Sequence, residues 1–381
     1  MRRVREPLRA ALPLFLALVL AGCSSSGGTA VTESGTTPSE QATTEPSPSS
    51  SPSGAGFSGI VMAELTDVQG SITLTAYSSS GTIMGTRTFT LPEDGGAMFR
   101  LQSGVEDIVT GQIVRQEFDR TFTRMAATLY NQSGGVPMHI GYLSEDGAFT
   151  DLTKSTAGYG GGQQMALFNP GTGRIWYKGV DSFGSVDPDN PSDARKESGV
   201  KFPLESNDYY HRYYFSPDGS WLMGLEMAQN TIFSLDGRKQ VLCGDEYSSC
   251  GPENYRVGSV GKVTYETPSL HVQGAADLSF AQPLWFLGGQ EKDSFLIVKK
   301  AQIYKMTISG KRMVAHPILP PSNQGVFRAV GSPDGKQVAF LASAGMNAAL
   351  YTVPSDGSAA PRLVADVPAN GNAHFLIDWT A

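Results

Sequence analysis

The chain has 381 residues, of which 40% are apolar and 17% charged, and its formal net charge is −7. A chain of this length can bury a large core, and a β-propeller or barrel can use all of it as a single domain. Lysine and arginine form no basic stripe. The composition therefore speaks against nucleic acid as a partner, because nucleic-acid binding depends on neutralising phosphates.

The chain begins with the features of an export signal. Arg2, Arg3, Arg5 and Arg9 make its start positive, and an apolar run follows over residues 10–21. This run is too short to cross a bilayer of about 30 Å as a helix. It fits the apolar part of a secretory signal peptide.

The run ends in Leu20-Ala21-Gly22-Cys23, which resembles the bacterial lipobox. The resemblance implies that residues 1–22 are a lipoprotein signal peptide and that Cys23 is lipidated as the mature N-terminus. We therefore expect a diacylglyceryl-Cys anchor in the cell membrane, with the protein on the extracytoplasmic face. The alternative is an ordinary signal peptide followed by a cysteine at this place by chance.

Residues 23–56 are predicted to be a tether. After Cys23 the segment is almost wholly Ser, Thr, Gly, Pro, Ala and Glu, and it contains no aromatic residue. Such a segment cannot bury enough apolar surface to offset the entropy cost of ordering it, so it is expected to be disordered. About thirty residues of this kind reach roughly 30 Å.

The remaining cysteines, Cys243 and Cys250, lie close together in the sequence. In an exported protein such a pair favours a disulfide that closes a small loop. A metal site is the rival interpretation, but two cysteines without a nearby histidine make a poor set of ligands.

From Phe57 onwards the sequence predicts an all-β domain over residues 57–381. Short apolar or alternating runs are separated by Gly, Asp, Ser and Pro, and no stretch shows sustained helical periodicity. The clearest unit, residues 327–364, contains two β-hairpins. The first turns on Ser332-Pro333-Asp334-Gly335, and the second on Ser355-Asp356-Gly357. Pro333 presets the φ of a type I turn, and Gly335 tolerates a left-handed conformation.

Weaker copies of this four-strand unit recur along the chain. They cover residues 118–153, 165–177, 209–242 and 284–316. A sixth unit results if the last apolar strand, His374–Trp379, joins the three strands within residues 60–91. The sequence thus predicts a six-bladed β-propeller of four-stranded antiparallel blades, closed by the C-terminal strand in the N-terminal blade. Residues 243–276 are interpreted as an insertion, although a seventh blade there is the alternative.

The Ser-Pro-Asp-Gly turns at 216–219 and 332–335 resemble the TolB-type propeller repeat. This resemblance implies the fold more than an activity, because similar blades occur in TolB, in prolyl oligopeptidase-like peptidases and in envelope lipoproteins. The tether stands where TolB has an α/β domain, so the resemblance does not extend to a role in the Tol system.

The sequence shows no catalytic signature and implies no cofactor. It has no Gly-x-Ser-x-Gly elbow, His-Glu-x-x-His motif, Walker loop or dinucleotide-binding fingerprint. One loop is rich in side chains that carry oxygen ligands, namely Asp181, Asp187, Asp189, Asn190 and Asp193. These residues could bind calcium, or they could simply form Asx turns. The spacing fits no calcium pattern well, so no metal site is predicted.

Polar and aromatic residues at the starts of inner strands are the candidate ligand site. They are predicted to face the central channel, although the alternative is that they pack between blades. The set comprises Gln164, Tyr209, Tyr210, His211, Arg212, Gln324, Arg328 and His374.

The sequence therefore predicts a monomeric, lipid-anchored propeller that binds an envelope protein or a small ligand without catalysis. The alternative is an envelope hydrolase or lyase acting on carbohydrate or peptide at the channel, where Glu117 and Asp208 are the nearest carboxylates. A spacer that binds nothing specific is the third possibility.

Overall fold

Most of the described chain is β-strand, nearly all of it paired antiparallel, and the fold is a β-propeller. The structure is a computed structural model, and the described residues lie within one compact unit, residues 51–381. These residues are 57–66, 70–92, 95–96, 108–129, 139–153, 164–179, 182–200, 212–215, 219–225, 229–236, 240–245, 272–273, 294–299, 302–309, 312–319, 325–344, 347–368 and 372–381.

The described strands form six four-stranded sheets, each named here by one of its strands. The first three sheets come from the N-terminal half and from the last strand of the chain. The β1 sheet contains β24 (Ala373–Thr380), β1 (Gly59–Thr66), β2 (Ser71–Tyr77) and β3 (Ile83–Thr90). The β5 sheet contains β4 (Gly95–Gly96), β5 (Arg124–Leu129), β6 (His139–Ser144) and β7 (Phe149–Asp151). The β8 sheet contains β8 (Gln164–Phe168), β9 (Ile175–Lys178), β10 (Phe183–Asp187) and β11 (Asn190–Glu197).

The other three sheets follow in chain order. The β12 sheet contains β12 (Arg212–Phe215), β13 (Trp221–Leu225), β14 (Gln229–Ser234) and β15 (Gln240–Asp245). The β17 sheet contains β17 (Ser294–Lys299), β18 (Gln302–Ser309), β19 (Arg312–Pro317) and β16 (Val272–Gln273), which runs parallel to β19. The β20 sheet contains β20 (Gly325–Gly331), β21 (Gln337–Ala344), β22 (Asn347–Pro354) and β23 (Arg362–Val367). The segment interpreted as an insertion therefore overlaps the end of β15 and includes β16.

The predicted junction between the two ends of the domain is present. β24 pairs antiparallel with β1, with Ala63 opposite Phe375 and Ile60 opposite Trp379. Gly59 N also donates to Thr380 Oγ1 at 3.1 Å. The last strand thus completes the N-terminal sheet.

The Ser-Pro-Asp-Gly turn in the β20 sheet has the predicted geometry. Gly335 has φ of 71°, and its N–H donates to the carbonyl of Ser332 at 2.8 Å. Asp334 Oδ1 accepts from Ser332 Oγ at 2.6 Å and from Lys336 N at 3.0 Å. These hydrogen bonds, that of Ser332 first, lower the pKa of Asp334 below its ordinary value. The turn therefore holds the two strands in register through its own side chains.

The core lies between neighbouring sheets. Phe340 and Val326 of the β20 sheet pack with Ile303 of the β17 sheet, and Leu341 packs with Ile60 of the β1 sheet. Between the β8 and β12 sheets, the buried hydroxyl of Tyr213 donates to the carbonyls of Met165 and Trp176. Burial raises the pKa of Tyr213 well above its ordinary value. Alternating apolar residues therefore face adjacent blades, as expected for half-buried strands.

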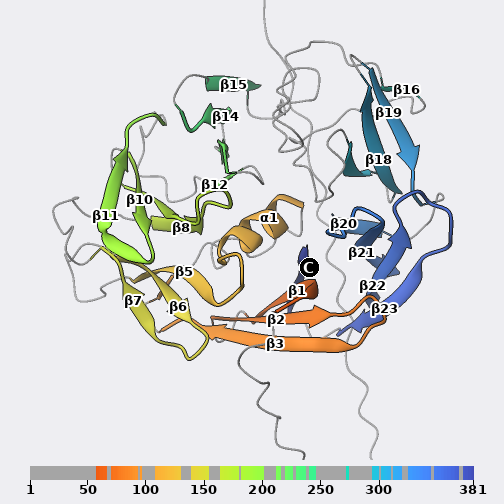
Figure 1. The fold of residues 1–381 in the computed structure, drawn as a ribbon, viewed down its shortest axis with the longest axis horizontal. Helices are drawn as coiled ribbons and strands as arrows, with labels where there is room; N and C mark the ends of the chain where they lie inside the picture. The colour runs from red at the N-terminus through yellow and green to blue at the C-terminus, as the bar shows by residue number, and fades with distance from the viewer. Residues whose placement is uncertain are drawn as a thin grey trace, which may run out of the picture. The chain divides into compact units, whose positions relative to one another are not determined.

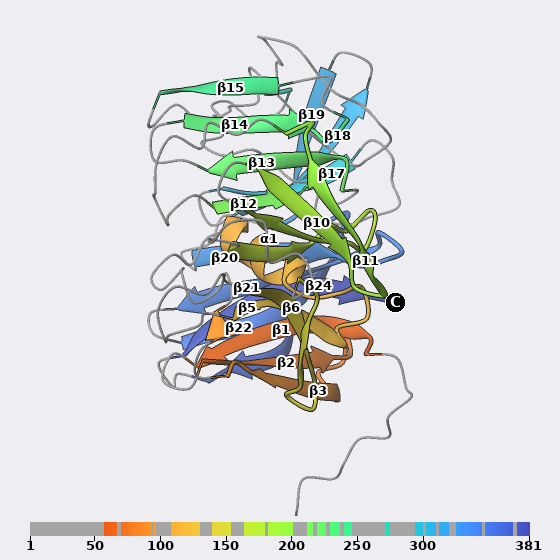
Figure 2. The ribbon, with the colours of Figure 1, turned by 90° about the vertical axis from the view of Figure 1, so that its left-hand side faces the viewer.

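One element was not predicted. α1 (Ile108–Gln116) is a nine-residue helix that contacts β8, β12, β20 and β24, which come from four different sheets. Figure 1 shows it among these strands, and in Figure 2 the strands from β12 to β15 lie at increasing distance from it. The sequence, which shows no sustained helical periodicity, did not indicate this helix. The helix is short, and it contains Gly111 and several β-branched residues, which have low helix propensity. Burial against surrounding strands stabilises it instead.

Among the described residues, no helix is long and apolar enough to cross a membrane.

Candidate functional site

The segment that leaves α1 is attached to the innermost strands around it. Gln116 is 5% exposed, and its side-chain Nε2 donates to the carbonyl of Phe215 at 2.7 Å. The backbone N of Phe215 donates back to Gln116 Oε1 at 2.7 Å. One amide side chain therefore satisfies both backbone groups of a residue at the end of β12, as a neighbouring strand would.

Arg115, one residue earlier, connects the helix to β24. Its Nε donates to Asp378 Oδ2 at 2.5 Å, and its Nη1 donates to the carbonyls of Phe118 and Asp119 at 3.2 and 3.1 Å. The guanidinium also lies 4.3 Å from the centroid of the Phe122 ring. Arg115 thus fixes the path of the chain as it leaves the helix.

Residues 119–124 form a tight turn between α1 and β5. Asp119 N donates to the carbonyl of Arg124 at 3.1 Å. The Asp119 carboxylate accepts from Thr123 N at 2.7 Å, from Thr123 Oγ1 at 2.6 Å and from Thr121 Oγ1 at 3.0 Å. Phe122 has φ of 57°, which is uncommon for a residue other than glycine. Its fully buried ring packs against Phe57 and Phe118, and this packing offsets the strain.

This turn forms one side of a cavity of about 450 Å³. Phe118, Phe168, Val330 and Ile377 supply apolar walls from the α1–β5 segment, β8, β20 and β24. The other residues that line it are Arg115, Gln116, Asp119, Arg120, Thr121, Arg124, Asn169, Pro170, Gly173, Pro188, Asp189, Gly331 and Asp378. The volume lies in the range of small-molecule sites, which are mostly apolar with a few placed polar groups.

Three arginines from a short stretch of sequence line the cavity, two held by ion pairs and the third by backbone carbonyls. Arg115 pairs with Asp378 at 2.5 Å, and Arg124 pairs with Asp189 at 2.7 Å. Arg120 instead donates from Nε and Nη2 to the carbonyl of Pro170, at 3.2 and 2.7 Å. Its Nη2 also donates to the carbonyl of Gly171 at 3.0 Å. The arginines therefore connect the turn to the β1 and β8 sheets.

The protonation of Arg124 follows from its surroundings. Partial burial acts to lower the pKa of Arg124, but the hydrogen bond and the charge of Asp189 outweigh it. The net result is a pKa above the ordinary value, so Arg124 stays protonated in its ion pair with Asp189.

The cavity lies near the ends of the inner strands, whereas the predicted ligand residues lie at or near their starts. Phe168 ends β8 and Gly331 ends β20, and both line the cavity. Of the predicted ligand residues, Arg328 and His374 have described side chains, and neither is among the residues that line the cavity. Their proposed role in a ligand site on the channel stays a prediction.

Two of these residues have described side chains. Arg328 is 4% exposed, and its guanidinium lies 4.0 Å from the centroid of the Phe375 ring. A Cβ on Gly111 of α1 would lie 3.4 Å from the Arg328 side chain. His374 is partly buried in β24. Arg328 therefore packs between the helix and the last strand.

The other predicted site residues lie wholly or partly outside the described residues. Gln164 and Arg212 are described only as the first residues of β8 and β12. Tyr209, Tyr210, His211 and Gln324 lie outside them altogether, as do Cys23 and Cys250, and Cys243 is described only as part of β15. Lipidation and the disulfide stay predictions.

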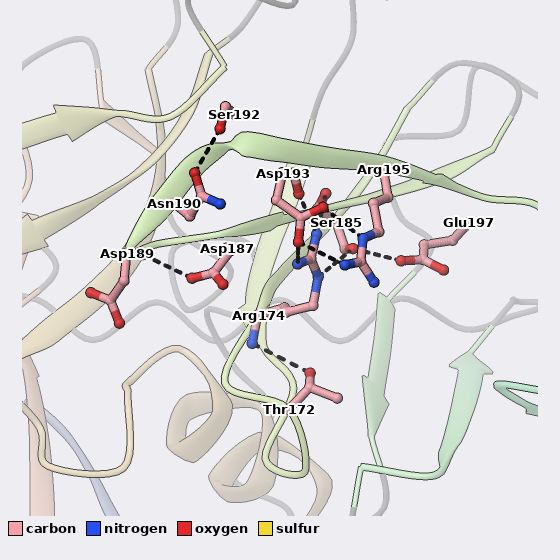
Figure 3. Close-up of polar contacts among 10 residues, drawn as sticks. All are labelled: Thr172, Arg174, Ser185, Asp187, Asp189, Asn190, Ser192, Asp193, Arg195 and Glu197. Atoms are coloured by element: carbon pink, nitrogen blue, oxygen red, sulfur yellow. Dashed lines mark hydrogen bonds and ion pairs between the residues drawn. The ribbon is translucent and has the colours of Figure 1, made fainter.

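The acidic loop considered for calcium is engaged largely by arginines. Asp193 Oδ2 accepts from Arg174 at 2.8 Å and from Arg195 at 2.7 Å, and Figure 3 shows its carboxylate between the two guanidinium groups. The hydrogen bond from Arg195 lowers the pKa of Asp193, and Arg174 adds to this effect. Asp187 and Asp189 lie apart from this cluster at the β10–β11 turn, where Asp187 Oδ1 accepts from Asp189 N at 2.9 Å. Within the described residues, no group of three or more His, Cys, Asp or Glu side chains is placed to hold a metal.

Sequence reasoning missed the arginines of the cavity. These arginines lie in one stretch that ends at the first residue of β5, Arg115-Gln-Glu-Phe-Asp-Arg120-Thr-Phe-Thr-Arg124. The many charged residues of this stretch were the signal in the sequence that could have indicated a binding site. Without the helix there was no reason to place this stretch at the centre of the fold. Glu117, named as a carboxylate near the channel, is fully buried at the end of α1.

Comparison with known proteins adds the fold neighbours but no family. No family model matches the chain, and no curated protein is similar to it. Similar solved structures include a prolyl endopeptidase, with 10% identity, a TM-score of 0.42, and coverage of 82% of this chain and 50% of that one. TolB from Acinetobacter baumannii has 13% identity, a TM-score of 0.34, and coverage of 80% and 68%.

A third similar structure is the β-propeller domain of the trilobed protease from Pyrococcus furiosus, with 9% identity, a TM-score of 0.33, and coverage of 82% and 99%. The chain thus spans half the length of the prolyl endopeptidase it matches. With TM-scores below 0.5, these likenesses carry no argument about activity, so function has to be argued from the cavity itself.

Proposed function

We propose that this protein is a membrane-anchored extracytoplasmic lipoprotein whose propeller binds a small ligand, or a segment of a partner, in the cavity beside α1. The observation that carries the proposal is the cavity of about 450 Å³, lined by apolar side chains together with three arginines and three aspartates. The location rests on the resemblance of Leu20-Ala21-Gly22-Cys23 to a lipobox.

The chemistry of the lining supports binding rather than hydrolysis. The carboxylates of Asp378 and Asp189 are paired with arginines, and that of Asp119 accepts three hydrogen bonds within its turn. A hydrolase needs a base or nucleophile within reach of the substrate. Among the described residues of the lining, Thr121 alone carries a hydroxyl, and that hydroxyl donates to Asp119. Such a site is built to hold a ligand.

The proposal is tested by placing a photoreactive amino acid in the cavity. The full-length protein carrying p-benzoylphenylalanine in place of Thr121 is irradiated in cells. Its mass is then measured by mass spectrometry, both as the intact protein and as peptides after digestion. Thr121 is exposed at the cavity, and Thr86 on β3 is an exposed threonine that does not line it. We expect a discrete adduct from position 121 and none from position 86. The same adducts from both positions, or none from position 121, would contradict a ligand site here.

A further inference from the structure

We infer that the cavity recognises its ligand through a carboxylate, with Arg120 as the principal cationic partner. This inference rests on the proposed function, because it names the class of ligand for the same cavity. It follows from which charged side chains of the lining are already paired with one another.

Two of the three arginines are neutralised within the protein. Arg115 binds Asp378 at 2.5 Å, and Arg124 binds Asp189 at 2.7 Å. The third aspartate of the lining, Asp119, accepts hydrogen bonds from its own turn. Among the described residues, Arg120 forms no ion pair, so it is the guanidinium of the lining that is left for an external anion.

Arg120 is also held in place before any ligand arrives. Its Nε and Nη2 donate to the carbonyls of Pro170 and Gly171, while its Nη1 forms no hydrogen bond with the described residues. A guanidinium fixed in this way presents its remaining N–H groups in a defined direction, so binding a planar carboxylate costs little further side-chain entropy.

The surroundings favour a ligand with a single negative charge and an apolar body. The described lining carries three arginines and three aspartates, so its charges balance, and Arg120 alone would not neutralise a phosphate, which carries nearly two negative charges at neutral pH. Phe118, Phe168 and Ile377 provide apolar contact area. The fitting class is therefore an amphipathic carboxylic acid, either a free small acid or the C-terminus of a peptide.

The test compares an acid with its amide. N-acetyl-L-phenylalanine and N-acetyl-L-phenylalaninamide have the same apolar body, and binding of each to the full-length protein is measured by titration calorimetry. Hydrogen bonds to a charged group contribute about 1.5–3 kcal/mol, so we expect the acid to bind roughly ten- to a hundredfold more tightly than the amide. Raising the salt concentration should weaken the binding of the acid more than that of the amide.

Variants locate the effect at Arg120. Arg120→Gln should bind acid and amide alike, whereas Arg362→Gln, which removes the same charge from an exposed position on β23, should keep the preference. Arg120→Lys keeps the positive charge but loses the guanidinium bonds to the carbonyls of Pro170 and Gly171, and it should retain part of the preference if Arg120→Gln does not fold. Circular dichroism checks the fold of each variant.

The outcomes separate this inference from the proposed function. Equal affinities for acid and amide, or equal loss of preference in Arg120→Gln and Arg362→Gln, would overturn the carboxylate inference while leaving a cavity that binds a neutral ligand. No binding of either probe would overturn it too, and a discrete adduct at position 121 would then still support the proposed function. A peptide with a free C-terminal phenylalanine that binds more tightly than N-acetyl-L-phenylalanine would identify a protein C-terminus as the source, and the reverse order would identify a free acid.

Discussion

At the scale of the residue, buried amide side chains take the place of missing backbone partners. Gln116 hydrogen-bonds both the N–H and the carbonyl of Phe215. Asn169, which is fully buried, similarly donates to the carbonyl of Gly219 at 2.9 Å and accepts from the N–H groups of Gly171 and Thr172. Each amide connects two blades or a blade and the helix, and each does so with both a donor and an acceptor.

Gln116→Glu tests this use of the amide. The carboxylate keeps an acceptor for Phe215 N but loses the donor for the Phe215 carbonyl, so a buried acceptor and a buried charge remain unsatisfied. We expect a loss of about 1–3 kcal/mol in the free energy of unfolding at neutral pH, measured by urea denaturation. The loss should shrink in acid, where the protonated side chain can donate again.

Gln337→Glu is the matched control, because Gln337 is exposed on β21. This change should alter the free energy of unfolding by no more than about 0.5 kcal/mol. If the two variants unfolded at the same urea concentration, the amide pair of Gln116 would not stabilise the junction between α1 and β12.

At the scale of the element, close approach between strands restricts single positions within one hairpin. A Cβ on Gly141 of β6 would lie 2.0 Å from the carbonyl oxygen of Thr150 and 2.6 Å from the Phe149 ring. Gly147, in the turn of the same hairpin, has φ of 81°, and a Cβ there would meet nothing within 4 Å. The first glycine is thus required by space and the second by backbone conformation.

These two causes predict different costs. Gly141→Ala should lower the free energy of unfolding by about 3 kcal/mol, because the atom it meets belongs to a backbone that cannot move without breaking the β6–β7 pairing. Gly147→Ala should cost about 1 kcal/mol, since only its left-handed conformation is strained. Denaturant unfolding of both variants measures the difference. A larger loss in Gly147→Ala than in Gly141→Ala would mean that the hairpin relaxes around the added methyl group.

At the scale of the whole molecule, the two ends of the domain meet beside the cavity. β24 pairs with β1 and supplies Ile377 and Asp378 to the cavity wall. Phe57, where the predicted tether joins the domain, packs on Phe122 of the turn that forms another side of the cavity. The proposed anchor is therefore connected to the fold next to the proposed ligand site.

Cys23→Ala tests the anchor. If Cys23 is lipidated, its replacement removes the acyl chains whose burial holds the protein at the membrane, and we expect most of the protein to move to the soluble fraction. Cell fractionation with immunodetection measures this, and metabolic labelling with a palmitate analogue should label the wild type but not Cys23→Ala. Cys243→Ala is the control, and it should stay with the membrane. Equal membrane retention of all three proteins would contradict a lipid anchor at Cys23.

The sequence by itself determined what depends on local rules. Pro333, Asp334 and Gly335 specify a tight turn through their own dihedral preferences and hydrogen bonds, and the structure confirms that turn. Alternation of apolar residues along strands such as β21 predicted antiparallel sheets packed face to face. The apolar residues of β24 indicated that the last strand would join the first, because its edge needs a partner.

Only the tertiary structure decided what lies at the centre. The residues of α1 have low helix propensity, so their helix depends on burial against four sheets, and no window of the sequence contains that information. The same holds for the cavity. Arg120 reaches the carbonyl of Pro170, and Arg115 reaches Asp378, across long intervals of sequence. Such contacts exist only once the blades are in place, because they depend on where several strands end together in space.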